Sequence, residues 1–232
     1  MDYATITQHL SVHGMIPRGG FYPTEADLVP VLPSGAAPKT VVLVGNTGSG
    51  MWEKFRSSEL SHVARDPMNV WTEHVLTKVA VAVAADVVFP FGGPPHHPFQ
   101  RWAKRSETVY SSPIGILLHP THGLWHAYRG ALLFEETIEL PPVSERPSPC
   151  DSCVDKPCLV TCPVAAFSAD GYDVPGCAKF LATTEGSQCL QIGCAARRAC
   201  PVGRDSCYEP THAEFHMQAF AQAIWAQKEG GD

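Results

Sequence analysis

Nine cysteines lie between Cys150 and Cys207, and no cysteine precedes them. Cysteine thiolates are the usual ligands of iron–sulfur clusters, and eight of the nine form two runs that each end in Cys-Pro. These runs predict two [4Fe–4S] clusters, and therefore a segment that carries electrons. The first run is Cys150, Cys153, Cys158 and Cys162 before Pro163, and the second is Cys177, Cys189, Cys194 and Cys200 before Pro201.

The spacing also predicts which cysteines share a cluster. In two-cluster bacterial ferredoxins, the last cysteine of each run binds the cluster of the other run. This rule assigns Cys150, Cys153, Cys158 and Cys200 to one cluster, and Cys162, Cys177, Cys189 and Cys194 to the other. Cys207 is left over. Several gaps are longer than in the usual pattern, but longer loops reach one metal centre at modest entropic cost.

Two other interpretations of the cysteines stay open. Zinc also binds four thiolates and would stabilise the fold without redox chemistry. Zinc ribbons usually pair two Cys-x2-Cys knuckles, however, and this chain has one, at Cys150 and Cys153. Disulfides fit less well, because the number of cysteines is odd and clustered cysteines in the cytosol are more often metal ligands.

Composition limits the partners and the compartment. A net charge of −6 argues against a nucleic-acid surface, which usually needs a basic face. The longest apolar run, Val79 to Val88, is too short to span a bilayer and contains Asp86. The first ten residues lack the basic and apolar regions of a secretory signal. We therefore expect a cytoplasmic protein without a membrane span.

The elements that must position these residues follow from the hydrophobic pattern. Strands and helices alternate through the first 140 residues, which favours an α+β or α/β sheet domain. The Pro-rich segment Leu140–Cys150 suggests a boundary, with one domain over 1–143 and another over 144–232. We expect helices at 5–13, 51–60, from Pro67, 99–106 and 210–228, and strands at 40–46, 85–90, 113–119 and 125–134, the last two as a hairpin.

One segment of the first domain resembles a known family. Residues 116–143 carry His119-Pro120, Gly123, Trp125, Ala127 and Arg129-Gly130 in the order found in CblC-type cobalamin-processing proteins. The tail is similar to the two-cluster end of epoxyqueuosine reductases and corrinoid reductive dehalogenases, which join a CblC-like domain to a ferredoxin-type module. The shared order of the two parts supports both resemblances.

The resemblance implies an α+β, nitroreductase-like sheet domain followed by a ferredoxin-like module. It also implies a bound cobalamin or other corrinoid, with flavin as the alternative cofactor, because such sheets hold either. Arg129 matches an arginine that helps to bind an anionic partner, which suits a planar guanidinium. The residues predicted to contact the cofactor are His119, Trp125, Tyr128 and Arg129, although a capped strand end is the favoured interpretation of His119.

The leading hypothesis is a cobalamin-dependent or cobalamin-processing reductase in which two clusters pass electrons to a corrinoid. It needs a low-potential electron donor and a small-molecule cofactor or substrate. A second hypothesis is an electron-transfer protein whose N-terminal domain docks a partner. A third is a zinc-stabilised binding module without a redox role.

Overall fold

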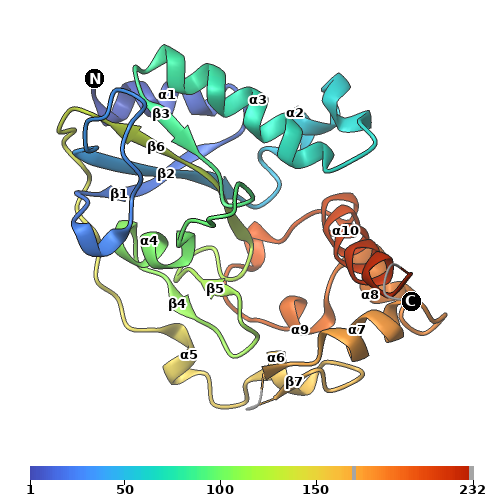
Figure 1. Cartoon of the computed structure of the whole chain (residues 1–232). Coiled ribbons are helices and arrows are strands. Elements are labelled where there is room, and N and C mark those ends of the chain that lie inside the picture. Colours follow the sequence, from blue (N-terminus) through green and yellow to red (C-terminus); the bar gives the residue numbers. More distant parts are fainter. Residues whose placement is uncertain (169–170, 230–232) are drawn as a thin grey trace. The chain divides into compact units, whose positions relative to one another are not determined.

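The computed structural model describes residues 1–168 and 171–229 of the chain (Figure 1). It divides into two compact units. The sheet unit comprises Met1–Val109 and His126–Arg146, and the cysteine unit comprises Tyr110–Trp125 and Pro147–Asp232. The segment 110–125 is therefore grouped with the tail. The predicted boundary at residue 143 separates two domains that would each fold independently, and it stays a prediction.

An antiparallel sheet of four strands forms the centre of the sheet unit. The strands lie in the order β1-β2-β6-β3, with bounds Ile16–Phe21, Thr40–Thr47, His126–Phe134 and Asp86–Val88. The two longest, β2 and β6, pair over their whole length, from Thr40 opposite Phe134 to Thr47 opposite His126. Nearly every side chain of β2 is buried, because helices cover both faces of the sheet.

Helices pack against both faces of this sheet. Figure 1 shows α1 (Tyr3–Ser11) and α3 (Pro67–Ala82) on one face and α4 (Phe99–Ser106) on the other. Pro67 occupies the first turn of α3, where its missing N–H costs nothing. Trp71, Val75, Leu76 and Val79 form the buried face of α3 at helical spacing. The strand and helix types predicted for this unit are confirmed.

A buried polar network lies inside the sheet unit. Arg18 donates from Nη2 to Glu107 Oε1 at 2.6 Å and from Nη1 to the carbonyl oxygen of Asn46 at 3.0 Å. The Tyr128 hydroxyl donates to the same Glu107 oxygen, and the guanidinium lies over the Tyr128 ring. Burial is the main cause that raises the pKa of Tyr128, and the Glu107 charge adds to it. The charges of Arg18 and Glu107 are therefore paired with each other inside the sheet unit.

The cysteine unit contains short elements joined by turns. Its strands form two pairs, β4 with β5 and β7 with β8. The strand bounds are Tyr110–Ser111, Leu117–Leu118, Phe167–Ser168 and Gly171–Tyr172. The helices are α5 (Pro149–Ser152), α6 (Pro157–Val160), α7 (Val174–Leu181), α8 (Ser187–Ile192), α9 (Ala195–Arg198) and α10 (Pro210–Glu229). The predicted C-terminal helix is confirmed as α10.

Two glycine turns meet backbone to backbone inside the cysteine unit. Gly123 (φ 59°) and Gly203 (φ 71°) both have left-handed backbones. A Cβ built on Gly123 would lie 2.0 Å from the carbonyl oxygen of Val202, and one on Gly203 would lie 2.1 Å from the carbonyl carbon of His122. Only glycine fits at either place. The turn that follows Cys200 thus rests directly on the segment 122–123.

Two predictions about local structure are wrong. The segment 113–119 does not form a hairpin with β6, because β5 pairs with β4 while β6 lies between β2 and β3. His119 and Gly123 instead close a tight turn on themselves, with both backbone hydrogen bonds at 2.8 Å. The helix predicted at 51–60 is shorter, since α2 covers Trp52–Arg56. Single turns of 3-10 helix occur at Glu25–Asp27, Glu59–His62 and Arg204–Ser206.

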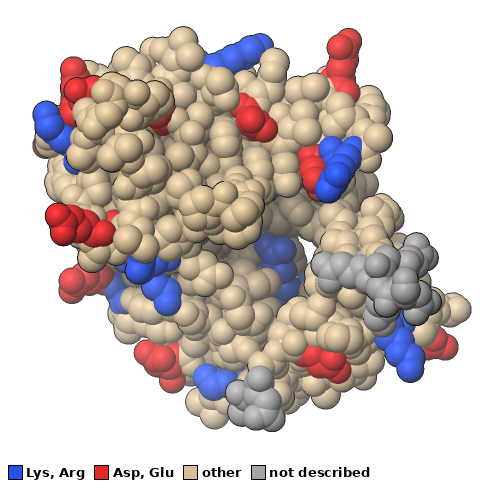
Figure 2. Space-filling view, viewed as in Figure 1, with Lys and Arg blue, Asp and Glu red and all other residues tan. Residues whose placement is uncertain are grey.

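No helix within the described residues is both long and apolar enough to cross a bilayer. On the face shown in Figure 2, Lys and Arg side chains are scattered, as are Asp and Glu side chains, and most of the surface is uncharged. This view shows no extended basic patch of the kind that nucleic-acid binding usually needs.

Candidate functional site

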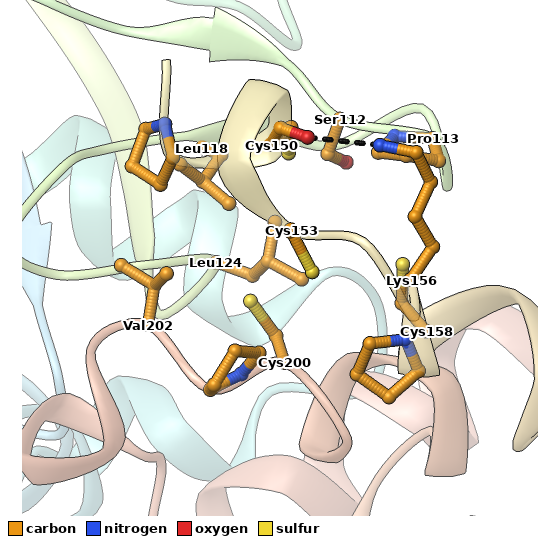
Figure 3. Close-up of a pocket in the computed structure, with 13 residues that line it drawn as sticks. Ser112, Pro113, Leu118, Leu124, Cys150, Cys153, Lys156, Cys158, Cys200 and Val202 are labelled. Atoms are coloured by element: carbon orange, nitrogen blue, oxygen red, sulfur yellow. Dashed lines mark hydrogen bonds between the residues drawn. The ribbon is translucent and has the colours of Figure 1, made fainter. Parts of the chain in front are cut away.

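Four cysteines line one pocket of the cysteine unit (Figure 3). Cys150 lies in α5, Cys153 directly follows it, Cys158 lies in α6 and Cys200 follows α9. Both α5 and α6 start with a proline, so each short helix begins abruptly after a change of chain direction. The predicted first set of ligands is therefore together in space. Figure 3 shows the sulfur atoms of Cys153 and Cys200 facing each other across the space.

The walls of this first pocket are apolar. Leu118, Leu124 and Val202 line it together with four prolines, and Ser112 has a buried hydroxyl without a hydrogen-bond partner among the described residues. Lys156 lies at its edge and donates from Nζ to the carbonyl oxygen of Cys150 at 2.8 Å. An apolar wall excludes water, and this raises the free-energy cost of a thiolate that has no metal.

The thiols of this set raise one another's pKa values. Burial raises the pKa of Cys158, and the nearby thiols of Cys200, Cys150 and Cys153 raise it further in that order. The pKa of Cys150 is raised by the same two causes. Such thiols hold their protons until a cation binds, because the positive charge of a metal favours the thiolate.

The second predicted set also gathers within the cysteine unit. Burial raises the pKa of Cys177 against a hydrogen bond from the Tyr172 hydroxyl, and the charges of Cys194, Cys162 and Cys189 raise it further. Cys194 has a raised pKa for the same main reason, and both Cys189 and Cys162 contribute. These four thiols come from separate segments, with Cys177 in α7 and Cys189 in α8. The ninth cysteine, Cys207, is exposed.

The described side chains do not form a preformed metal site. No group of three or more His, Cys, Asp or Glu side chains that could hold a metal ion occurs among residues 1–168 and 171–229. The assignment of the two cysteine sets to [4Fe–4S] clusters, and the zinc alternative, stay predictions.

The residues predicted to contact a cofactor lie in both units. Tyr128 and Arg129 are neighbours on β6 at a point where its register with β2 shifts, and Arg129 is the extra residue. Tyr128 belongs to the Arg18–Glu107 network. Arg129 donates to the side chains of Thr72 and Asn69 and to the carbonyl oxygen of Met68, all on α3. The two side chains therefore contact different parts of the sheet unit.

The other two predicted contact residues belong to the cysteine unit. His119 accepts hydrogen bonds at Nδ1 from the backbone N–H groups of Thr121 and His122, so it caps the turn after β5. Trp125 is buried, and its ring lies 5.4 Å from that of Tyr208 and 4.5 Å from the guanidinium of Arg197. Of the four predicted contact residues, Trp125 is the one that lines a pocket described below.

A second pocket of the cysteine unit involves residues that the sequence patterns did not reveal. Its cavity of about 400 Å³ is lined by Trp125, Arg197 and His216, among others. His216 lies 3.2 Å from His212 between their Nε2 atoms, one turn apart on α10. The spacing of the two histidines on a predicted helix was a usable signal, but nothing in the sequence links that helix to Trp125.

Comparisons with known proteins support the fold. No family model matches the chain, and neither does any curated protein. Among solved structures, the chain is similar to a B12-trafficking protein CblC from C. elegans, with a TM-score of 0.56 and 17% identity over 94% of this chain and 91% of the other. It is also similar to epoxyqueuosine reductase from Bacillus subtilis, with a TM-score of 0.51 and 14% identity over 90% and 69%. The CblC-like fold is thus confirmed.

Proposed function

We propose that this chain is an iron–sulfur redox protein that binds two [4Fe–4S] clusters and passes their electrons to a bound corrinoid. The observation that carries the proposal is the grouping of eight cysteines into the two sets that the ferredoxin rule predicts. When bound, the clusters supply single electrons at low potential, and a corrinoid supplies the reactive cobalt.

The chain's own residues would hold the clusters and shield them from water. Cys150, Cys153, Cys158 and Cys200 would hold one cluster against apolar side chains that exclude water. Low polarity around a cluster influences its potential, as do hydrogen bonds to its sulfur atoms. At the second set, the backbone N–H of Ala166 donates to Cys162 Sγ at 3.4 Å, and the N–H groups of Arg197 and Ala196 donate to Cys194.

The corrinoid part of the proposal is supported by fold likeness to CblC and epoxyqueuosine reductase. Likeness of fold does not fix a ligand, so this part needs its own test. The protein is purified without oxygen and assayed for iron and sulfide, and hydroxocobalamin is then added. We expect about eight iron atoms per chain and a shifted corrinoid absorption spectrum on binding. A protein free of iron would contradict the cluster part of the proposal. A corrinoid spectrum that does not change would contradict the corrinoid part.

The predicted corrinoid contacts can be tested one residue at a time in the same assay. Tyr128→Phe and Arg129→Gln should weaken hydroxocobalamin binding without changing the iron content. Flavin replaces corrinoid in the proposal if the purified protein shows flavin absorption and does not change the hydroxocobalamin spectrum.

One observation favours a second candidate function. The side chains of Tyr128 and Arg129 already make several hydrogen bonds within the sheet unit. An electron-transfer protein, whose sheet unit docks a partner, would need no cofactor there. Full iron content together with no hydroxocobalamin binding would support that function instead.

A further inference from the structure

The second pocket of the cysteine unit has aromatic and aliphatic walls. Its lining includes the rings of Phe167, Tyr172 and Phe220, the side chains of Ile114 and Ile116, and Met217. Phe167 and Tyr172 are stacked with ring centroids 4.6 Å apart. Its volume of about 400 Å³ lies within the range of small-molecule sites, which is roughly 300–1,000 Å³. Flat apolar walls suit a flat apolar ligand.

One part of the lining carries a positive charge. Arg197 lines the cavity together with the Trp125 side chain. Trp125 is 2% exposed, and its indole N–H is buried and closed off from the cavity. Arg197 is therefore the group in this part of the lining that could bind the polar end of a ligand.

Arg197 is held rigidly in this position. Its Nε and Nη2 donate to the carbonyl oxygen of Leu124 at 3.1 and 2.6 Å. Its guanidinium lies 4.5 Å from the ring centroid of Trp125 and 4.6 Å from that of Tyr208. No carboxylate within the described parts of the chain forms an ion pair with it, and none lines the cavity. A fixed guanidinium of this kind suits a planar anion such as a carboxylate.

We propose that this cavity is a binding site for a small aromatic carboxylate. The carboxylate accepts hydrogen bonds from the Arg197 guanidinium, and the aromatic ring packs against the apolar walls. Cys194 also lines the cavity, so a ligand bound there lies beside the second set of cysteines. That this ligand is the class of substrate for the redox reaction rests on the proposed function, whereas its binding does not.

Titration calorimetry with 1-naphthoate tests the site on the protein purified without oxygen and with its iron content measured. We expect saturable binding with a dissociation constant below about 1 mM, and at least tenfold weaker binding of 1-naphthylmethanol, which has no charge. Binding weaker than about 1 mM, or equal binding of acid and alcohol, would overturn the proposal.

One variant locates the binding. Arg197→Gln removes the charge, and it should weaken 1-naphthoate binding roughly tenfold or more while leaving 1-naphthylmethanol unchanged. Arg204→Gln is the matched control, because Arg204 is exposed and does not line the cavity. Circular dichroism checks that each variant is folded. If Arg197→Gln is not folded, Arg197→Lys provides a milder change.

The outcomes separate this site from the proposed function. A protein with about eight iron atoms that binds no 1-naphthoate contradicts the site alone. A protein without iron that still binds 1-naphthoate through Arg197 contradicts the redox function alone. Equal loss of binding in Arg204→Gln would show a general effect of charge and overturn the location.

Discussion

The two units of the chain differ in whether their buried polar groups are paired with other groups. In the sheet unit, Arg18 pairs with Glu107, and the Tyr128 hydroxyl donates to that same carboxylate. In the cysteine unit, thiols with raised pKa values gather in two sets, and the Trp125 indole N–H is buried without a partner among the described residues. The sheet unit pairs its buried charges by its own contacts, whereas the cysteine unit would gain stability from the proposed clusters if they bind.

The largest effect that this comparison predicts is on metal removal. Chelation of iron should abolish the cooperative folding of the cysteine unit, because metal binding and folding are coupled when the ligands are thiolates. Hydrogen exchange followed by mass spectrometry should show lost protection in α7, α8 and α10 and kept protection in β2 and β6. Equal loss of protection in both units would break the comparison.

Single cysteine substitutions should divide the iron content by set. Cys158→Ser is expected to remove the first cluster and lower the iron content from about eight to about four atoms per chain. Cys177→Ser should do the same for the second cluster, with a different change in the electron paramagnetic resonance spectrum. Cys207→Ser is the control and should keep all the iron. Loss of iron in the control would mean that Cys207 is a ligand.

The buried ion pair of the sheet unit gives the next effect. Arg18→Met removes the cation that forms the buried ion pair with Glu107, so we expect about 3–5 kcal/mol less stability for the sheet unit. Iron content should not change. The free energy of unfolding, measured by urea denaturation with a probe in the sheet unit, tests this, and the double variant Arg18→Met, Glu107→Leu should recover part of the loss.

Arg129 should have a smaller effect on stability. Arg129→Gln removes the donors to Thr72 and Asn69, and we expect a loss of about 1–2 kcal/mol from the connection between β6 and α3. A change in hydroxocobalamin binding without a change in stability would instead show that Arg129 acts mainly on the ligand. The same urea denaturation experiment and the spectral titration measure the two effects.

The smallest effect concerns acid. Burial acts to raise the pKa of Asp27, but hydrogen bonds from Arg105 and Thr24 outweigh it, and the pKa is lowered. Asp27 therefore adds stability above its unfolded pKa of about 3.9, and this is lost as the pH falls through the lower folded value. Asp27→Asn should cost less than about 1 kcal/mol at pH 7, and the cost should shrink as the pH falls through the folded pKa of Asp27. Stability curves against pH for both proteins would test this.

The sequence predicted local elements well where a pattern is confined to one segment. The strand at 40–46 and the helix at 99–106 depend on neighbouring residues, and both are present. The pairing of β6 with β2 depends on residues more than 80 positions apart, such as Thr40 and Phe134, and no local pattern encodes it. The false hairpin arose for this reason.

The same limit applies to the candidate site. Cysteine spacing predicted which thiols lie near one another, because each cysteine is identifiable by its chemistry alone, and their role as ligands stays a prediction. The pairing of Arg197 with Trp125 is different, since arginine and tryptophan occur throughout any chain and only the fold brings these two together. Arg129 is the opposite case. Its residue type predicted a group that binds an anion, but in the structure it donates hydrogen bonds to α3.

The contact of Gly123 with Val202 and of Gly203 with His122 determines how the tail can be used. A fragment that begins at Pro147 contains every cysteine of the chain, yet it lacks the turn on which the segment after Cys200 rests. Transplanting the tail alone onto another protein should therefore leave Cys200 poorly positioned relative to Cys150, Cys153 and Cys158. The smallest portable unit is discontinuous and includes residues 110–125, so a fusion design must supply that segment in trans or through a circular permutation.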